Sequence, residues 1–419
     1  DRLASIQDSY YGGRLDKART IVEKAIKKNK SEADVLKLER SLIDLADGRP
    51  EQAERTLREV RDHFDDLEQK DVGESIISTL TDDNRLSYAG EDYEKLLVRC
   101  FLSLANLMHD GEDASAYGLQ VGEKQRDIIQ AGADDSGSNP KLAYKRVALG
   151  AYIHATLQEA THTNWDEAER SIQLVANWEP DFEFADADLN RVRNGRHSEP
   201  GNGVLYVFTL VGRGPYKVER PEIASSAALL IADRILSATG KHSLPPTIAP
   251  IKVPVLIRNR SRVSSVGVAI DGTRRGQTAT ITDVSQLAIA QYEAVFPRIM
   301  ARAVVRRVVK KGTIYATKEV AHIDHPAANL ALDLAGVAWE ASESADTRCW
   351  GLLPDQIQVL RIELPAGEHE ITLTAQDGRS SIGSGARHTV IVEDSRNTYV
   401  LGSFPDAELV GQILVSNAH

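Results

Sequence analysis

The stretch Asn164-Trp165-Asp166-Glu167-Ala168, which runs on to Trp178-Glu179-Pro180, decides the architecture of the first half of this 419-residue chain. A short polar turn is followed by an acidic helical turn, where the helix dipole favours negative charge. Ala168 is small enough for two helices to approach closely, and Pro180 ends the helical pattern. The stretch therefore predicts the second helix of a helical hairpin.

The same pattern recurs earlier in the chain, at a spacing of 35 positions. Gly-Arg-Leu-Asp-Lys-Ala at 13–18 is echoed by Gly-Arg-Pro-Glu-Gln-Ala at 48–53, and each copy leads into apolar residues at helical spacing. The glycine predicts a left-handed end to one helix, and the acidic residue after it predicts the start of the next. A weaker third copy begins at Gly90, and the stretch from Gly111 opens a further helix toward Ile129.

This period is close to that of a 34-residue helix-turn-helix repeat, and residues 1–195 resemble a tetratricopeptide-repeat (TPR-like) array. The resemblance implies a curved stack of helices that presents a groove to a peptide or protein segment. We expect Ala18, Ala53 and Ala168 to be buried where paired helices cross. The paired Asp and Glu side chains of this half are expected on exposed helix faces.

The period of the sequence changes after a linker at 196–202. Residues 204–211, Val-Leu-Tyr-Val-Phe-Thr-Leu-Val, are β-branched and aromatic without polar alternation, which predicts a strand buried on both faces. The chain is thus predicted to be α+β in two parts. TPR-like helices at 1–195 precede a β-rich, sandwich-like domain at 203–419, with inserted helices at about 221–240, 283–311 and 327–340.

Several local patterns in the second half predict hairpins. Asp271-Gly272 is a tight-turn signal between strands at 265–270 and 279–282. Two further hairpins are expected, one joining 357–364 to 371–375 through Pro365-Ala366-Gly367, and one joining 388–392 to 398–401. Asp283 should cap the long helix, which should be kinked at Pro297.

Charge is distributed unevenly between the two halves. Up to Pro200, 27 Lys and Arg face 40 Asp and Glu, a balance of −13, whereas the remainder has 23 against 21, a balance of +2. Nucleic acid is therefore not an expected partner of the helical half, because phosphate binding needs clustered cations. No run of 18 apolar residues is present, so the sequence predicts no transmembrane helix.

One helix of the second half carries a basic ridge. It consists of cations four residues apart, Arg298, Arg302, Arg306 and Lys310. Two interpretations are open. The ridge is either a solvated face with cations near a helix C-terminus, or a docking edge for an anionic partner.

The sequence contains no recognisable catalytic constellation, and it predicts no catalytic, cofactor-binding or metal-binding residues. Gly-x-Ser-x-Gly and His-Glu-x-x-His are both absent. His322, Asp324 and His325 bring three potential metal ligands together, but nothing nearby completes a shell. Cys100 lies in a helical apolar pattern and is expected to be a buried, inert thiol.

The order of parts resembles a group of poorly characterised bacterial cell-envelope proteins. The residues that carry this resemblance are Trp350-Gly351-Leu352-Leu353-Pro354, Arg361, the stretch 364–369, Gly203-Val204 and the stretch 214–219. Members are typically exported lipoproteins, which implies a periplasmic or outer-membrane-associated location, although no cysteine precedes Cys100.

The resemblance implies a non-enzymatic scaffold or adaptor that binds protein partners through its groove and associates peripherally with the envelope. Two alternatives stay open. One is a self-assembling structural subunit, in which the acidic half of one copy meets the basic ridge of the next. The other is a hydrolase.

Overall fold

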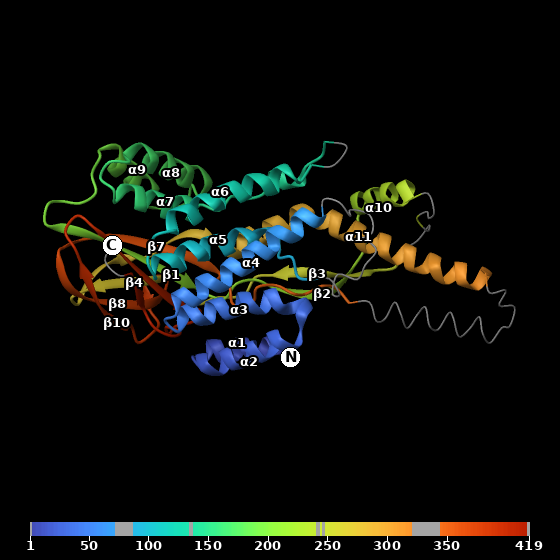
Figure 1. Ribbon diagram of the computed structural model, residues 1–419, viewed down its shortest axis with the longest axis horizontal. Coiled ribbons are helices and arrows are strands. Elements are labelled where there is room, and N and C mark those ends of the chain that lie inside the picture. The colour runs from blue at the N-terminus through green and yellow to red at the C-terminus, as the bar shows by residue number, and fades with distance from the viewer. Residues whose placement is uncertain are drawn as a thin grey trace.

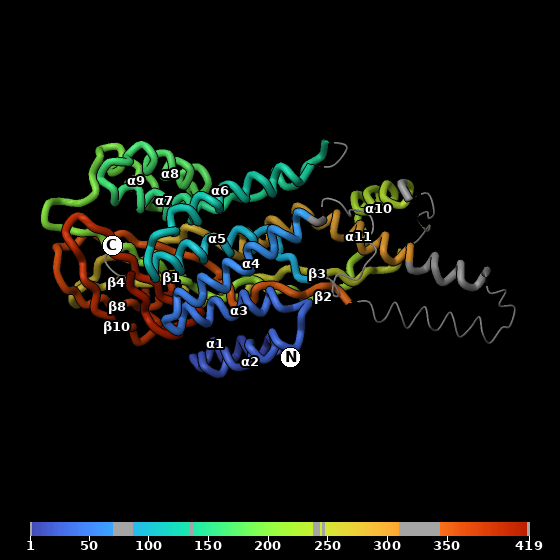
Figure 2. Tube along the Cα trace, in the orientation of Figure 1, coloured from blue at the N-terminus to red at the C-terminus, as the bar shows by residue number. Residues whose placement is uncertain are grey.

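A computed structural model describes residues 2–71, 87–133, 137–239, 244, 248–320 and 344–416. It has the α+β, two-part layout that the sequence predicted, with a run of helices followed by a β-rich part (Figure 1). The helices form a layer over the sheets, and the Cα trace shows the C-terminal strands beside the N-terminal helices (Figure 2). Contacts between these ends include those of Tyr10 Oη with Ser403 Oγ at 3.2 Å and of Gln412 N with Ala46 O at 3.0 Å.

The helical part contains nine α-helices within the described residues, and each packs against the next along the chain. The described residues between them include the 3₁₀ turns η1 (Lys30–Glu32) and η4 (Pro140–Ala143). The α-helices are α1 (Arg2–Tyr11), α2 (Leu15–Lys28), α3 (Ala33–Ala46), α4 (Pro50–Asp71), α5 (Asp92–Leu107), α6 (Ala114–Gln130), α7 (Leu149–Glu159), α8 (Trp165–Trp178) and α9 (Ala185–Arg193).

The repeated glycines end helices as predicted. Gly13 and Gly48 have φ angles of 69° and 74°, in the left-handed region that favours glycine. After each one, the next N–H bonds back to a carbonyl five residues earlier, from Arg14 to Ser9 at 2.8 Å and from Arg49 to Asp44 at 2.8 Å. These are the bonds of a Schellman end, and they turn each helix into its antiparallel partner.

The three alanines predicted at helix crossings are all fully buried. Ala18, Ala53 and Ala168 each have 0% exposure, on α2, α4 and α8. An even closer approach occurs between α6 and α7. There a Cβ added to Gly118 would lie 2.7 Å from the Gly150 carbonyl oxygen. Small residues therefore set how closely these helices pack.

The β-rich part is a sandwich of two sheets. One has the strand order β12-β11-β1-β7-β6 and the other β10-β8-β4-β5, with β9 (Ser380–Ser381) paired to β8. The strands of the first sheet are β1 (Asn202–Val211), β6 (Ala279–Asp283), β7 (Gln356–Pro365), β11 (Asn397–Phe404) and β12 (Leu414–Val415). Those of the second are β4 (Ser265–Ile270), β5 (Thr273–Gln277), β8 (Gly367–Asp377) and β10 (Ala386–Val392).

All three predicted hairpin pairings are wrong, although most of the strands exist. β7 and β8 lie in different sheets, as do β10 and β11, because the chain crosses the sandwich at both turns. Asp271 and Gly272, with φ angles of 51° and 73°, join β4 to β5, a strand that the sequence did not predict, while β6 pairs with β7. A turn signal shows where a strand ends, but the sheet that receives the next strand depends on distant segments.

Strand β1 links the two parts of the molecule and is buried on both faces, as predicted. Leu205, Val207 and Val211 belong to the core between the two sheets. Tyr206 and Phe208, which alternate with them, belong to the core that the sheet shares with the helices. The helical and β-rich parts therefore bury apolar surface against each other.

An arm extends from this body. It consists of β2 (Tyr216–Glu222), β3 (Ile251–Ile257), α10 (Ser226–Thr239) and the distal part of α11 (Val284–Val320). Asp283 caps α11 as predicted, since its Oδ1 accepts the Gln286 N–H at 2.8 Å. α11 continues past Pro297 and runs beyond the predicted end at residue 311. The helix predicted at 327–340 lies outside the described residues.

Candidate functional site

The inner side of the helical layer holds a segment of the chain itself. The Glu39 carboxylate accepts the N–H groups of Gly351 and Leu352 at 2.7 and 3.0 Å. Glu94 accepts the N–H of Trp350 at 2.7 Å, and the Trp350 side chain is fully buried. The stretch 350–354, which carried part of the envelope resemblance, thus joins the helical and β-rich parts.

These two glutamates contradict the expectation that acidic pairs of the first half lie on exposed faces. Glu39 and Glu94 both have 0% exposure. Burial raises the pKa of the Glu39 carboxyl to about 8, against the opposing effect of its N–H donors. Burial also raises the pKa of Glu94. Only the folded chain shows this, because the partners are backbone groups more than 250 positions away.

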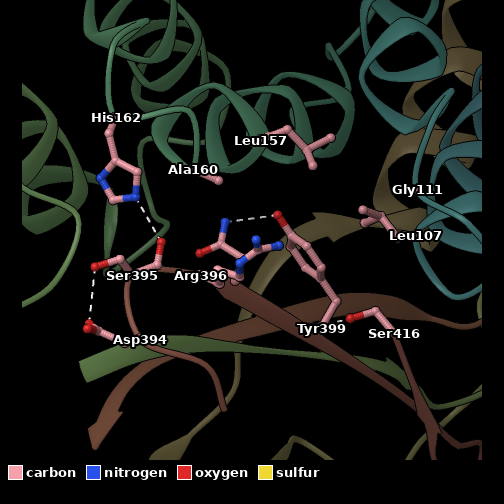
Figure 3. A pocket seen from close by; sticks show the side chains of 11 residues that line it. Leu107, Gly111, Leu157, Ala160, His162, Asp394, Ser395, Arg396, Tyr399 and Ser416 are labelled. Carbon is pink, nitrogen blue, oxygen red and sulfur yellow. Dashed lines mark hydrogen bonds between the residues drawn. The ribbon is translucent and has the colours of Figure 1, made fainter. Parts of the chain in front are cut away.

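A cavity of about 460 Å³ lies between the helices and β11 (Figure 3). At its mouth, His162 Nε2 donates to the Ser395 carbonyl at 2.8 Å. Deeper in, Asn397 Nδ2 donates to Tyr399 Oη at 3.0 Å and to Thr156 O at 2.9 Å. These polar groups bond to one another across the junction, which indicates a structural role for the cavity wall.

A larger depression lies between α4, α5, α6, η4 and α11. We call it the α4–α11 groove, and its volume is about 990 Å³. Acidic and basic side chains line it in equal number, six of each. The basic ones are Arg61, Lys95, Arg99, Lys124, Lys141 and Arg302. Arg302 thereby brings one member of the predicted basic ridge to the acidic helical part of the same chain.

Most charges of the groove are paired. Lys124 Nζ lies 2.8 Å from an oxygen of Asp65, and Arg99 Nη2 lies 2.6 Å from the other. Burial alone would raise the pKa of the Asp65 carboxyl, but these two cations outweigh it and hold that pKa below its usual value. Arg302 differs, because it is exposed and makes no hydrogen bond or ion pair with the residues that the structure describes.

A second cavity of about 230 Å³ adjoins the groove, and Asp92, Lys141 and Arg302 line both. We call it the Gln291 cavity, after a side chain of α11 that is 3% exposed. Neither Gln291 Nε2 nor Gln291 Oε1 has a hydrogen-bond partner among the described residues. A buried amide without hydrogen-bond partners lowers the stability of the folded protein. A ligand group or a water molecule that bonds to the Gln291 amide would remove this cost.

The structure places the members of the predicted ridge differently. Arg298 Nη1 and Nη2 donate to the carbonyls of Gly132 and Ser138, at 2.9 and 3.2 Å. Arg298 thus ties α11 to the loop after α6. Arg302 lines the groove, Arg306 is half-buried, and Lys310 lies in α11 with its side chain outside the described part.

Other candidate chemistry is sparse in the described part of the chain. It contains no cluster of three or more His, Cys, Asp or Glu side chains arranged to hold a metal ion. His322, Asp324 and His325 lie outside it. Cys100 is a fully buried free thiol, and burial raises its pKa to about 12, which fits the inert role predicted for it. No described helix is long and apolar enough to cross a membrane.

Sequence reasoning missed the Gln291 cavity. Its walls come from α5, η4, β3 and α11, which are far apart in the chain. One signal was present, since Gln291 is a polar residue in the largely apolar stretch from Leu287 to Phe296, which also contains Glu293, on a predicted helix. That signal alone does not distinguish a buried amide from an exposed one.

Comparisons with known proteins found no matching family model, no matching curated protein and no matching solved structure. The function has to be argued from the molecule itself.

Proposed function

We propose that the protein is a non-enzymatic scaffold or adaptor that binds a segment of a protein partner in the α4–α11 groove. The proposal includes the location that the envelope resemblance implies, in the periplasm or peripherally at the outer membrane. The exposed Arg302, which has no partner among the described residues, carries the argument. It stands in a groove whose other described cations are largely ion-paired.

The groove is favoured over the inner side of the helical layer, where a TPR-like array would hold its partner. Trp350 and the segment around it already occupy that side, fixed by Glu39 and Glu94. A partner there would have to displace a buried part of the protein's own core. Trp350 and its neighbours do not line the α4–α11 groove, which is open and has charges of both signs that can orient a polar segment.

Site-specific photocrosslinking tests this. A photoreactive residue at Gln69, which is exposed in the groove, should capture a discrete polypeptide in envelope preparations of the source organism. The same residue at Arg170, exposed on α8 outside the groove, is the matched control. Adding Arg302→Glu should weaken capture from Gln69. Equal capture at both positions, or capture unaffected by Arg302→Glu, would contradict the proposal.

A self-assembling structural subunit is the second candidate, and one observation favours it. Ile223 and Leu230, on the arm, are 75% and 72% exposed. A contact between copies would cover such side chains. Sedimentation velocity at low and high salt discriminates the candidates. Association through apolar side chains should persist at high salt, and Leu230→Glu should abolish it. The groove proposal instead predicts a monomer at both salt concentrations.

A further inference from the structure

The Gln291 cavity offers a more specific prediction about the partner. The amide of Gln291 has a free donor and a free acceptor side by side, and it is 97% removed from solvent. An anion in the cavity would satisfy the N–H donors and leave the oxygen unpaired, whereas a cation would do the reverse. A group that carries both an acceptor and a donor satisfies both atoms.

We propose that the cavity binds a primary carboxamide, the side chain of an Asn or Gln on the partner segment. Two carboxamides pair through two N–H···O bonds, so either orientation of the Gln291 amide is served. This inference rests on the proposed function, because it places the anchor of the partner segment beside the α4–α11 groove.

The rest of the cavity wall suits such an anchor. Leu256, Ala288 and Tyr144 are buried and bound its apolar sides. Apart from Arg302, the charges closest to this anchor are engaged, since Asp92 accepts from Tyr144 Oη at 2.9 Å and pairs with Lys141 at 2.7 Å. A neutral polar group therefore enters without disturbing an ion pair. Water competes for the site, because a cavity of about 230 Å³ exceeds the share of about 30 Å³ that one liquid water takes.

The position of Arg302 adds a second feature to the partner. Although Arg302 lies eleven positions after Gln291 in α11, its side chain lines the Gln291 cavity as well as the groove. The partner segment should therefore carry an acidic residue close to its carboxamide anchor.

Propionamide is the probe for the cavity, and propionate of the same shape is its control. With the full-length protein labelled with ¹⁵N-glutamine, propionamide should shift the side-chain amide resonance of Gln291 saturably. Gln291→Met identifies that resonance by its loss. Propionate can accept from the Gln291 N–H but has no donor for its oxygen, so it should bind more weakly and shift that resonance less than propionamide does. No shift with propionamide, or equal shifts with the two probes, would overturn the inference.

If the Gln291 resonance is too broad to follow, the Tm of the protein gives a second measurement of propionamide binding. Met has a similar shape and no hydrogen-bonding amide, so Gln291→Met should raise the Tm of the ligand-free protein and abolish its response to propionamide. A lowered Tm would mean that the Gln291 amide is already satisfied, which would overturn the inference. Gln120→Met, in the groove but outside the cavity, is the matched control and should keep the propionamide response.

The two proposals fail separately. Probe binding needs no partner, so it tests the cavity alone. If photocrosslinking from Gln69 depends on Arg302 but propionamide does not bind, the groove proposal stands and the carboxamide anchor is wrong. If propionamide binds and crosslinking fails, the cavity is a small-molecule site and the scaffold function is wrong.

Discussion

The carboxylate of Glu39 accepts the backbone N–H of Gly351 at 2.7 Å, although 312 positions separate the two residues. This bond joins α3 of the helical part to the segment that leads into β7. The Glu39 side chain is fully buried, and burial raises the pKa of its carboxyl group. The stability of this contact should therefore depend on pH.

Stability should depend on pH through Glu39. Its pKa is about 8 in the folded protein and near 4.5 in an unfolded chain, so the folded state holds an extra proton between these values. The stabilisation from that proton is complete below about pH 4.5 and is lost as pH rises through 8. Thermal unfolding from pH 5 to 9 should show Tm falling with pH. Glu39→Gln should flatten the fall, and exposed Glu51→Gln should not. Parallel profiles for all three proteins would refute this.

Replacing Ala168 by Leu should destabilise the α7–α8 hairpin. Ala168 has no exposed surface, and extra methylenes in a packed interior cost about 1–3 kcal/mol. Urea unfolding measures this. Ala116→Leu, at an exposed position of α6, is the control and should change stability by less than about 0.5 kcal/mol. If Ala168→Leu unfolds like the parent, the alanine does not set the helix spacing.

Two glycines of α6 should respond to alanine in opposite directions. At Gly118 an added Cβ would lie 2.7 Å from the Gly150 carbonyl oxygen, whereas at Gly122 it would meet nothing within 4 Å. Gly118→Ala should therefore destabilise the protein by about 1–3 kcal/mol. Gly122→Ala should stabilise it by about 0.5–1 kcal/mol, since glycine is a poor helix former. Differential scanning calorimetry of the pair checks the signs, and a shared sign would be inconsistent with the α6–α7 contact.

Two members of the predicted basic ridge should have different roles: Arg298 a structural one and Arg302 a binding one. Arg298→Met removes two hydrogen bonds to the carbonyls of Gly132 and Ser138, each contributing about 0.5–1.5 kcal/mol. Arg302→Met removes no such bond within the described chain and should change stability by less than about 0.5 kcal/mol. Chemical unfolding of both variants compares them directly. Equal losses would show that Arg302 is structural as well.

The helix boundaries and burial of the first half could be predicted because their causes are local. A helix that ends in a left-handed φ favours glycine at that position, as at Gly48. Ala53 is buried at a helix contact because its side chain is small, whichever helix packs against it. The apolar run of β1 likewise predicted two buried faces. It could not say that one face meets the second sheet and the other meets the helices.

What the sequence by itself determined is therefore the helix ends at the repeated glycines and the burial of small and apolar side chains such as Ala53 and those of β1. Only the tertiary structure decided the partners. Pro365 and Gly367 mark a turn in either case, but the pairing of β7 with β1 and of β8 with β4 depends on segments that lie far away in the chain. The same holds for the candidate site. Gln291 becomes an unpaired buried amide only when α5, η4 and β3 close around it, because hydrogen bonding and burial depend on neighbours in space.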